Sequence, residues 1–583
     1  MSDFVSEAGR FLPRFSDVRD IDEFVETLGR FERGEIGAEE FRRYRLARGV
    51  YGQRQEGVQM LRVKIPQGVV AASQLRCLAE VARRWGRGYG HVTTRQNIQY
   101  HFIAMAEIEA ALRVLDASGL TTREACGNTV RNVCADPLAG VRDHGTFDVT
   151  PYAEAITRFF LRKGWANSLP RKFKIALGYA PGDTALAAIH DIGLVAQVRD
   201  GRRGFAVRVA GGLSTSPQNA LLWHTFLDAD DLLDACEAVV RVFDRTGNRE
   251  NKHRARLKYV LRRLGPEKFV EALNEEYAAV KARGGTPLDL GVATAPPSPP
   301  SLGPDTEAPA TRSKGYLRWR GSNVLDQDQP GYHVVLVRLA IGKITAAQFD
   351  ALADLAEAHS DGTARLSQEQ GVVLRWVPTA RLPAVHAALE AMGLGRPDAR
   401  SVGDVTTCPG AESCNLAVTA SRQVGGAIAE YLDTTPAIAP WVEAAASTTI
   451  KVSGCPNSCG QHHIANLGWH GAARRAGDRT APVYQLHLGG GFDAGGARFG
   501  RQVIKIPARR VPEAVGRLLG LYVDARHADE TPDAFYARVE SKTVSALLED
   551  LAALDAATPD EVFLDLGQDQ GFQIAIGEGE CAA

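Results

Sequence analysis

Two short cysteine-containing stretches in the last third of the chain decide how the sequence is interpreted. The first is Thr407-Cys408-Pro409-Gly410-Ala411-Glu412-Ser413-Cys414-Asn415, and the second is Gly454-Cys455-Pro456-Asn457-Ser458-Cys459-Gly460. Four thiolates from two turns predict a soft-metal site, because thiolates select zinc, copper(I) or iron–sulfur clusters. Proline and glycine beside each pair let the backbone bend around a metal and direct amides at the sulfurs.

The spacing of the cysteines bears on which metal they bind. Five residues separate Cys408 from Cys414, three separate Cys455 from Cys459, and forty lie between the two pairs. Ribbon-type zinc sites usually place roughly two to four residues between paired cysteines, so the wide first pair argues against zinc. Buried cysteines without a ligand are the alternative interpretation, which suits one such pair better than two.

The cysteine pattern resembles that of a known family. Cys-x5-Cys followed downstream by Cys-Pro-Asn-x-Cys is similar to the signature of the sirohaem-containing sulfite and nitrite reductases, and the resemblance extends over residues 42–526. In that family four cysteines hold a 4Fe–4S cluster, and the last also ligates the sirohaem iron. The resemblance therefore implies cluster binding by Cys408, Cys414, Cys455 and Cys459, with Cys459 as the bridge to sirohaem.

Length and composition describe an ordinary globular chain. Its 583 residues are too many for one core and predict roughly three or four domains. The formal net charge of −1 gives no field that would attract nucleic acid or a membrane surface. Residues 1–14 lack the apolar core of a secretory signal, and no stretch approaches the run of about 20 apolar residues of a membrane helix. Nine cysteines do not form an evident disulfide framework, so we expect a cytoplasmic protein.

The order of the predicted elements repeats, which indicates an internal duplication. A strand at 60–66, a helix at 71–85, a strand at 92–103 and a helix at 108–118 form the first unit. A strand at 333–339, a helix at 346–359 and a strand at 364–377 form the second, with Gln348 in register with Gln74. Further along, residues 205–213 are echoed by residues 484–492. Each half is therefore predicted to be a small unit followed by a larger α/β unit.

The resemblance implies an α+β fold, a pseudo-twofold duplicated nitrite/sulfite reductase fold around a central cofactor. The predicted parts are a helical arm (1–50), a ferredoxin-like half-domain (51–120), a sirohaem- and substrate-binding α/β domain (121–283), a Pro-rich linker (284–314), a second ferredoxin-like half-domain (315–398), a cluster- and sirohaem-binding α/β domain (399–526), and a C-terminal helix and tail (527–583). We expect the end of the tail to be disordered, with an incidental thiol at Cys581.

The two predicted copies carry different chemistry. Alignment of 94–97 with 367–370 sets three functional positions of the first copy against the second: Arg62 against Leu336, Arg95 against Gln368, and the segment around Arg131 against that around Cys414. The first copy has kept cations and the second has kept metal ligands. Scaffolding alone gives no reason for this division.

Basic residues of the first half predict a site for a small anion. Arg62 and Arg95 are expected on apolar strands, where a charge costs free energy unless it meets a partner. Lys172 and Lys174 alternate in a predicted strand and therefore share one face, where like charges repel unless an anion lies between them. A surface cation on an edge strand is the alternative for any one of these residues. The resemblance assigns Arg62, Arg131, Lys172 and Lys174 to the substrate, and Arg95 to the sirohaem carboxylates.

Sirohaem carries several carboxylates, so its binding requires many donors. The basic run 249–258, which contains Lys252, Arg254 and Arg256, suits this role, as does the glycine loop Gly211-Gly212. The same run would also suit a solvated helix face or a nucleic-acid patch. We expect further hydrogen bonds near the ring from Gln96, Asn97, Asn132 and Asn457.

The resemblance also draws attention to Tyr51 and Cys126. They occupy positions that some members of the family join by a covalent Tyr–Cys link near the substrate. A core tyrosine and a buried thiol are the alternative interpretation.

Together these features predict an electron-transfer enzyme. The resemblance implies the assimilatory six-electron reduction of sulfite to sulfide, and Lys172-Phe173-Lys174 favours sulfite because plant nitrite reductases of the family carry asparagine at the second position. Nitrite reduction to ammonium is the close alternative. A cobalamin-pathway oxygenase and a non-catalytic zinc or cluster scaffold are more distant ones, because neither explains the cations. No flavin or nicotinamide module is apparent, so we expect an external donor, either ferredoxin or a flavoprotein subunit.

Overall fold

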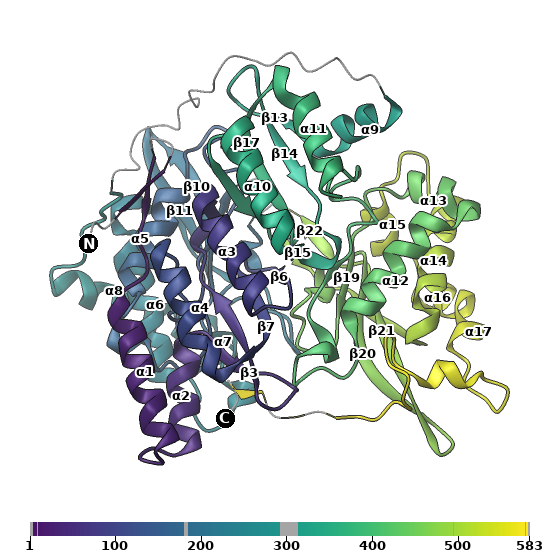
Figure 1. Ribbon diagram of the computed structural model, residues 1–583, viewed down its shortest axis with the longest axis horizontal. Helices are drawn as coiled ribbons and strands as arrows, with labels where there is room; N and C mark the ends of the chain where they lie inside the picture. The colour runs from purple at the N-terminus through teal and green to yellow at the C-terminus, as the bar shows by residue number, and fades with distance from the viewer. Residues whose placement is uncertain are drawn as a thin grey trace.

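The computed structural model describes residues 4–7, 10–179, 185–291, 313–493, 495–575, 577 and 579–580. Its described part contains four five-stranded sheets and two two-stranded ones. The five-stranded sheets fall into two pairs of matching topology, one pair in the small units and one in the large units. Figure 1 shows the two halves side by side, with helices α3 and α10 next to each other where they meet.

The N-terminal arm precedes the first small unit and is mainly helical. A hairpin of β1 (Phe4–Glu7) and β2 (Arg10–Pro13) leads into α1 (Val18–Glu32) and α2 (Ala38–Ala47). The side chain of Asp17 begins α1 by accepting a hydrogen bond from the backbone N–H of Arg19. Phe24 and Phe41 are buried in the core of the small units, so the arm is packed against that core.

The two small units have the same order of elements. The first contains β3 (Val50–Gly52), β4 (Val58–Val63), β5 (Val69–Ala71), α3 (Ala72–Arg84), β6 (Tyr89–Val92), β7 (Ile98–Ala104) and α4 (Ile108–Ala117). The second contains α9 (Lys314–Asn323), β13 (Val324–Asp326), β14 (Tyr332–Val337), β15 (Lys343–Thr345), α10 (Ala346–His359), β16 (Thr363–Leu366), β17 (Val372–Pro378) and α11 (Leu382–Ala391). The single strands predicted at 92–103 and 364–377 are each two strands joined by a turn.

Each small unit contributes one strand to the sheet of the other unit. The first sheet has the order β15-β6-β7-β4-β3 and the second has the order β13-β14-β17-β16-β5. Lys343 of β15 pairs with His91, and Ala71 of β5 pairs with Thr363. One hydrophobic core therefore runs through both small units, which fixes the two halves of the molecule relative to each other.

The predicted register of the first helix of each unit is confirmed. The Gln74 side chain accepts a hydrogen bond from the backbone N–H of Ala71 at 3.0 Å, and Gln348 accepts one from Thr345 at 3.0 Å. Both glutamines occupy the third helical position, where a side-chain oxygen satisfies an amide that the helix cannot pair. Thr345 completes a capping box by accepting the N–H of Gln348, whereas Ala71 has no side-chain acceptor.

The predicted alignment of the two turns is wrong by one residue. Gln96 (φ 54°) and Gln370 (φ 68°) both have left-handed backbones, and each donates its N–H to the residue three positions earlier. The Gln96 amide then donates to the carbonyl of Leu366, and the Gln370 amide donates to that of Val92, both at 2.9 Å. Gln96 therefore matches Gln370, and Arg95, which lies in the turn and not on a strand, matches Glu369.

The large units also share one topology. The sheet of the first consists of β8 (Cys134–Ala135), β9 (Ile175–Tyr179), β10 (Ile192–Arg199), β11 (Arg202–Val209) and β12 (Leu221–Asp228). That of the second consists of β18 (Thr406–Thr407), β19 (Ile450–Ser453), β20 (Leu467–Ala476), β21 (Arg479–Leu488) and β24 (Arg501–Pro507). In both sheets the first three strands run parallel to one another, and the last two strand pairings are antiparallel. The predicted echo of 205–213 in 484–492 thus corresponds to β11 and β21.

Helices cover these sheets. They are α5 (Thr150–Phe160), α6 (Leu232–Thr246), α7 (Leu257–Leu264) and α8 (Pro266–Ala282) in the first large unit, and α12 (Ser421–Thr434), α13 (Ala439–Ala444) and α14 (Val511–Ala525) in the second. The second unit also has the short pair β22 (Gly491–Asp493) and β23 (Gly496–Arg498). Separate hydrophobic cores fill the two large units.

The predicted match between the segments around Arg131 and Cys414 is wrong. Ala135 of β8 donates its N–H to the side chain of Gln96, and Thr407 of β18 donates to the equivalent Gln370. These bonds equate β8 with β18. Arg131 precedes β8 whereas Cys414 follows β18, so these two residues come from opposite ends of equivalent strands.

The predicted linker lies mostly in residues 292–312, outside the described residues. At the C-terminus, α15 (Pro532–Arg538), α16 (Ser541–Leu547) and α17 (Glu549–Ala552) confirm the helical character predicted there. The predicted disorder of the tail is wrong for its described residues, because Gly577 bonds Asn415 and Glu580 bonds Arg45 in the N-terminal arm. Figure 1 shows the chain end returning to the first half beside β3. Cys581 lies outside the described residues.

Candidate functional site

A cavity of about 1430 Å³, its open mouth included, lies between the two halves. Both copies of the duplication contribute to its wall. The residues predicted as functional that line it are Tyr51, Arg62, Arg95, Asn97, Cys126, Arg131, Asn132, Lys172, Lys174, Cys408, Cys414, Cys455, Asn457 and Cys459. The structure thus brings cations of the first half and thiols of the second half to one cavity.

The four cysteines occupy two loops that follow equivalent points of the second large sheet. Cys408 follows β18 directly, and Cys455 comes two residues after the end of β19. The loops approach each other closely, since a Cβ on Gly454 would lie 2.9 Å from the Cα of Gly410. Gly410 also has a left-handed backbone with φ 64°. Glycine is therefore required where the two cysteine loops touch.

The burial and close spacing of the four thiols favour a metal cation bound among them. Burial, followed by the neighbouring Cys459, raises the pKa of Cys414 to about 11, and the same two causes raise the pKa of Cys408. Thiolates so close together repel each other unless a metal compensates their charge. The N–H of Gly454 points at the Cys408 sulfur at 3.2 Å, as the prediction of amides directed at sulfur requires. This donor set fits a cationic cluster ligated by sulfur.

The arginines of the opposite wall are held by backbone carbonyls. Arg131 donates to the carbonyls of Gly127 (2.8 and 2.6 Å) and Ala125 (3.1 Å). Arg95 donates to the carbonyl of Asn132 at 2.5 Å and contacts His190. These bonds hold both guanidinium groups in place without neutralising them, because carbonyls are uncharged acceptors. Both guanidinium groups also line the cavity.

Lys172 and Lys174 lie just before β9 rather than on a strand. Between them Phe173 forms an isolated bridge with Val130, so the predicted alternation is kept although the strand is not. Phe173 is fully buried, and both lysines line the cavity. Burial and then the cations Arg256, Arg95 and Lys172 hold the pKa of Lys174 well below its ordinary value. Such a lysine readily gives up a proton.

Six residues predicted to bind sirohaem do not line this cavity in the described part of the chain. Gln96 is buried and bonds the carbonyls of Ala135 and Leu366, which braces the two halves. Arg256 pairs with Asp191. The remaining four stand elsewhere: Gly211 and Gly212 in a tight approach beside Ala188 and Arg256, and Lys252 and Arg254 in a short turn before α7, where Arg254 is exposed.

Several polar residues of β6 and β7 line the cavity and were not predicted. Gln99 and His101 alternate along β7 and therefore share one face, on which Gln99 pairs across to Arg62 and to His91. Both ring nitrogens of His101 are buried without a hydrogen-bond partner among the described residues. Burial, followed by the charge of Arg422, holds the pKa of His91 and of His101 well below the ordinary value. Polar residues at every second position of an otherwise apolar strand are the signal that identifies this face.

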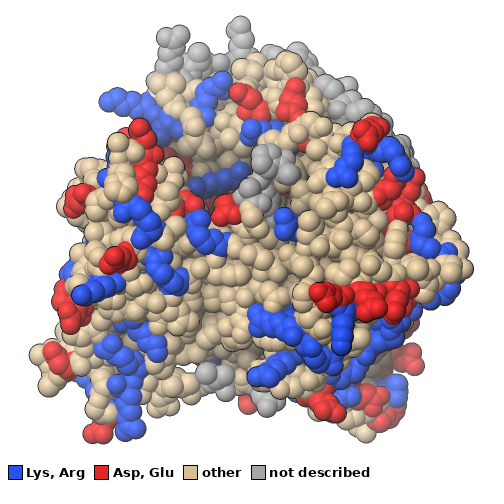
Figure 2. All heavy atoms as spheres, turned by 180° about the vertical axis from the view of Figure 1, so that it is seen from behind, with Lys and Arg blue, Asp and Glu red and all other residues tan. Residues whose placement is uncertain are grey.

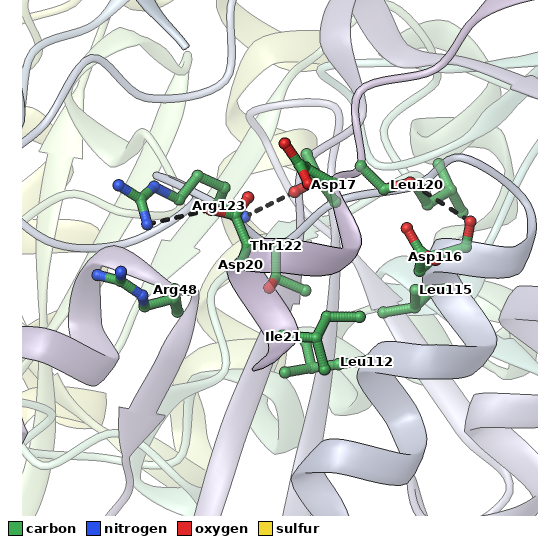
Figure 3. Close-up of a pocket in the computed structure, with 12 residues that line it drawn as sticks. Asp17, Asp20, Ile21, Arg48, Leu112, Leu115, Asp116, Leu120, Thr122 and Arg123 are labelled. Carbon is green, nitrogen blue, oxygen red and sulfur yellow. Dashed lines mark hydrogen bonds and ion pairs between the residues drawn. The ribbon is translucent and has the colours of Figure 1, made fainter. Parts of the chain in front are cut away.

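A second, much smaller pocket lies against the N-terminal arm (Figure 3). Its charged side chains form ion pairs: Arg123 with Asp20 at 3.3 Å, and Arg48 with Glu23 at 2.9 Å. The pocket therefore has the character of a packed junction between the arm and α4.

The outer surface has a mixed charge. Figure 2 shows lysine and arginine interspersed with aspartate and glutamate over the rear face, in keeping with the net charge of −1. Among the described residues, no helix has both the length and the apolar character needed to cross a bilayer.

Comparison with known proteins agrees with this architecture. The nitrite and sulphite reductase 4Fe-4S domain matches residues 126–281, and the nitrite/sulfite reductase ferredoxin-like half domain matches 51–118 and 325–392. A ferredoxin–nitrite reductase of Synechococcus elongatus is 31% identical over 445 residues, covering 75% of this chain and 81% of that protein. A sulfite reductase [ferredoxin] of Mycobacterium tuberculosis is 30% identical over 483 residues, covering 81% and 80%.

The solved structure of the Mycobacterium tuberculosis NirA protein has a TM-score of 0.73 and 26% identity, covering 91% of this chain and 98% of that one. The chain belongs to the nitrite and sulfite reductase family, and it is an oxidoreductase with the duplicated α+β fold. Its cofactors are sirohaem and a 4Fe–4S cluster. The 4Fe-4S domain match falls on the first large unit, whose sheet has the same topology as the sheet that carries the four cysteines.

Proposed function

We propose that the chain reduces sulfite to sulfide, with the anion bound between the cations of the first half and the cysteine-held centre of the second. The observation that carries this proposal is the common cavity of Arg62, Arg131, Lys172 and Lys174 with Cys408, Cys414, Cys455 and Cys459. In this proposal the four cysteines would hold the cluster, and Cys459 would also ligate the sirohaem iron. Arg95, Asn97, Asn132 and Asn457, which line the cavity, would bind the carboxylates and edge of the ring.

The cofactors, when bound, would pass on the electrons of the external donor, and the chain supplies charge and protons. Sulfite takes up six electrons, and each oxygen that leaves as water requires two protons. Arg62 and Arg131 stay charged throughout and orient the oxygens. Lys174 donates protons, since its lowered pKa brings its proton transfer nearer to neutral pH. Lys172 lies on the same wall of the cavity and adds a further positively charged hydrogen-bond donor.

Nitrite is the second candidate substrate, because the similar proteins include reductases of both anions. One of the similar proteins is a ferredoxin–nitrite reductase, and another is a sulfite reductase [ferredoxin]. The choice of sulfite rests on Lys174, because nitrite reductases of plants carry asparagine at this position of the motif. Both relatives are named for ferredoxin, which supports ferredoxin as the electron donor; a flavoprotein subunit is the alternative donor.

Steady-state kinetics test the proposal. With anaerobic holoenzyme and a reduced viologen as donor, we expect kcat/KM for sulfite to exceed that for nitrite. Lys174→Asn should lower kcat/KM for sulfite at least about tenfold and leave nitrite reduction less affected, since a loss of roughly 1.4 kcal/mol in transition-state binding is tenfold. Lys268→Asn, on the exposed side of α8, serves as control. A wild-type preference for nitrite would overturn the choice of substrate, and reduced ferredoxin in place of viologen tests the donor.

A further inference from the structure

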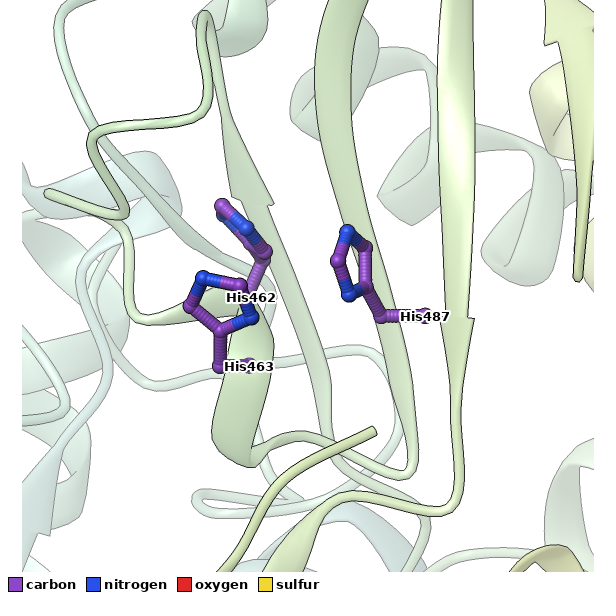
Figure 4. A group of neighbouring side chains, drawn as sticks. All are labelled: His462, His463 and His487. Atoms are coloured by element: carbon purple, nitrogen blue, oxygen red, sulfur yellow. The ribbon is translucent and has the colours of Figure 1, made fainter. Parts of the chain in front are cut away.

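Four histidines of the second large unit meet at one point outside the cavity. His462 and His463 belong to the short helix η11 (His462–Ile464), His470 to β20 and His487 to β21. The ring centres of His462 lie 4.2 Å from His463, 4.7 Å from His487 and 5.0 Å from His470. Figure 4 shows the rings of His462, His463 and His487 turned toward a common space. The proposed reduction makes no use of this cluster.

His462 lacks partners for both of its ring nitrogens. Its side chain is 0% exposed, and neither Nδ1 nor Nε2 has a hydrogen-bond partner among the described residues. Buried polar atoms in folded proteins are nearly always satisfied by protein, water or an ion. Two unsatisfied nitrogens on one imidazole, surrounded by three further imidazoles, indicate that this group receives a partner that the chain itself does not provide.

Backbone carbonyls set the tautomers of two neighbouring rings. His463 Nε2 lies 2.9 Å from the carbonyl of Ser214, and His487 Nδ1 lies 3.4 Å from that of Gly500. A carbonyl only accepts, so these nitrogens carry the protons, and the lone pairs remain on His463 Nδ1 and His487 Nε2. Metal-binding histidines are oriented in this way, with the second ring nitrogen donating to a carbonyl or carboxylate.

The rings are also in the protonation state that binds a metal. Burial is the main cause that holds the pKa of His462 well below its ordinary value and that lowers those of His463 and His487 to about 4 and about 3. All three are therefore neutral at physiological pH, and a neutral imidazole has the lone pair that a metal requires.

We infer that His462, His463 and His487 hold one late first-row transition-metal ion, with Zn²⁺ as the representative ion. Their ligand atoms all lie within 4.8 Å of one another. Tetrahedral zinc with Zn–N bonds of about 2.0–2.1 Å needs nitrogens about 3.3 Å apart, so the rings close inward by an ångström or so on binding. His470, whose Nδ1 is 2.7 Å from His487 Nε2, gives up that hydrogen bond and stands beside the open fourth position. Three imidazoles without a carboxylate suit zinc, copper or nickel and do not suit magnesium or calcium.

The local backbone is shaped to bring these rings together. Gln461, with φ 64°, turns the chain into η11. A Cβ on Gly468 would lie 1.9 Å from the carbonyl oxygen of His462, so η11 can rest on β20 only because that residue is glycine. The ion would tie η11, which begins three residues after Cys459, to β21. Through the His463–Ser214 bond it would also brace the loop that follows β11 in the first half.

Metal content and X-ray absorption of the holoenzyme test this inference, independently of activity. Anaerobic protein is equilibrated with zinc sulfate and desalted, and zinc is measured beside iron by mass spectrometry. We expect about one zinc per chain, with zinc-edge distances of about 2.0 Å to nitrogen, as against about 2.3 Å for zinc on cysteine. His462→Ala and His487→Gln should each lower the zinc content at least about fivefold. His386→Gln, which removes a buried imidazole packed on Trp319, should retain it.

Three results would overturn the inference. They are wild-type protein that retains less than about a fifth of an equivalent of zinc, an absorption spectrum dominated by sulfur ligands, and a zinc content that the His462 and His487 variants leave unchanged. Should either variant fail to fold, the absorption spectrum of the wild type alone decides. The result does not depend on whether sulfite or nitrite is the substrate, since neither anion takes part.

Discussion

Arg256 donates two hydrogen bonds through one nitrogen to the carboxylate of Asp191, at 3.0 and 2.8 Å. The same carboxylate accepts the backbone N–H of Lys174 at 2.9 Å. The Arg256 and Asp191 side chains are 9% and 1% exposed, so the pair is shielded from water. Arg256 was predicted to bind the cofactor, but the structure places it behind the cavity wall, where its partner Asp191 anchors the backbone of Lys174, a residue of the cavity lining.

Replacing Arg256 should therefore impair both stability and anion binding. Arg256→Gln leaves the buried Asp191 charge uncompensated, and breaking such a pair costs about 3–5 kcal/mol in the free energy of unfolding. Without Arg256, Asp191 should hold the Lys174 backbone less firmly. This loss of position should raise KM for the anion more than it lowers kcat. Urea unfolding and steady-state kinetics measure the two effects. Arg254→Gln, two residues away and exposed, is the control, and equal behaviour of the two variants would refute this role for Arg256.

The buried ion pair of Lys64 and Glu124 predicts how the free energy of unfolding varies with pH. Lys64 lies 3.7 Å from Glu124, with side chains 2% and 1% exposed. Burial, partly offset by Glu124, lowers the pKa of Lys64 from 10.5 to about 8. Between these two pH values the unfolded chain binds more protons than the folded chain, so this lysine makes the free energy of unfolding rise with pH, by up to about 1.4 kcal/mol per pH unit.

Lys64→Met should remove that rise. Urea unfolding between pH 7 and pH 10 would show the wild type gaining free energy of unfolding relative to the variant above about pH 8. Below that pH the difference between the two proteins should stay constant, because Lys64 is then protonated in both states. Lys268→Met on the exposed side of α8 is the control and should follow the wild type. Parallel curves for the wild type and Lys64→Met would contradict the assignment.

Substitution of single cysteines should distinguish the ligands of the cluster from ordinary buried thiols. Cys408→Ala should abolish the cluster, because three cysteines cannot complete a four-thiolate site. Acid-labile sulfide and the low-temperature electron paramagnetic resonance of the reduced protein measure this loss. Cys236→Ala removes a thiol that is also buried but lies in the core of the first large unit, and it should retain the full sulfide content. Sulfide retained in Cys408→Ala would exclude that residue as a ligand.

The sequence predicted the features that depend on local pattern. The cysteine spacing located the loops at Cys408 and Cys455, and the order of strands and helices located the duplication, because apolar periodicity and motif spacing are local properties. The one-residue error at Gln96 and Gln370 arose because their left-handed backbones occur at residues other than glycine, so the local sequence does not mark the position of the turn. The Arg256–Asp191 pair and the bond between Glu580 and Arg45 join residues far apart in the chain, and no local pattern specifies such partners.

The returning tail supplies a further prediction. The Glu580 carboxylate accepts the N–H of Gly52 at 2.6 Å and pairs with Arg45, and the neighbouring Gly579 lines the cavity. Glu580→Gln removes the charge from these bonds, which are worth about 1.5–3 kcal/mol each to a charged group. The tail should then open more often, so chymotrypsin should cleave after Phe572 about tenfold faster. Glu56→Gln, on an exposed loop, is the control. Unchanged cleavage would show that the ion pair does not hold the tail.

Tyr51 and Cys126 permit a test of the covalent link that the family resemblance suggests. Tyr51 lies on β3, Cys126 is buried with its sulfur 3.9 Å from the carbonyl of Gly49, and both residues line the cavity. A bond from the thiol sulfur to the tyrosine ring removes one hydrogen from each group and passes two electrons to an oxidant such as dioxygen. Trypsin cuts on both sides of each residue, so peptides 49–54 and 124–131 should appear joined and two hydrogen atoms lighter than their sum.

Alkylation of the denatured protein before digestion decides the matter. Iodoacetamide should leave Cys126 unmodified in the wild type while it labels Cys134, which lies in a different tryptic peptide and acts as an internal control. In Cys126→Ala the 49–54 peptide should appear alone at its unmodified mass. Recovery of separate wild-type peptides with Cys126 alkylated would show that the pair stays unlinked and that Tyr51 lines the cavity as an unmodified phenol.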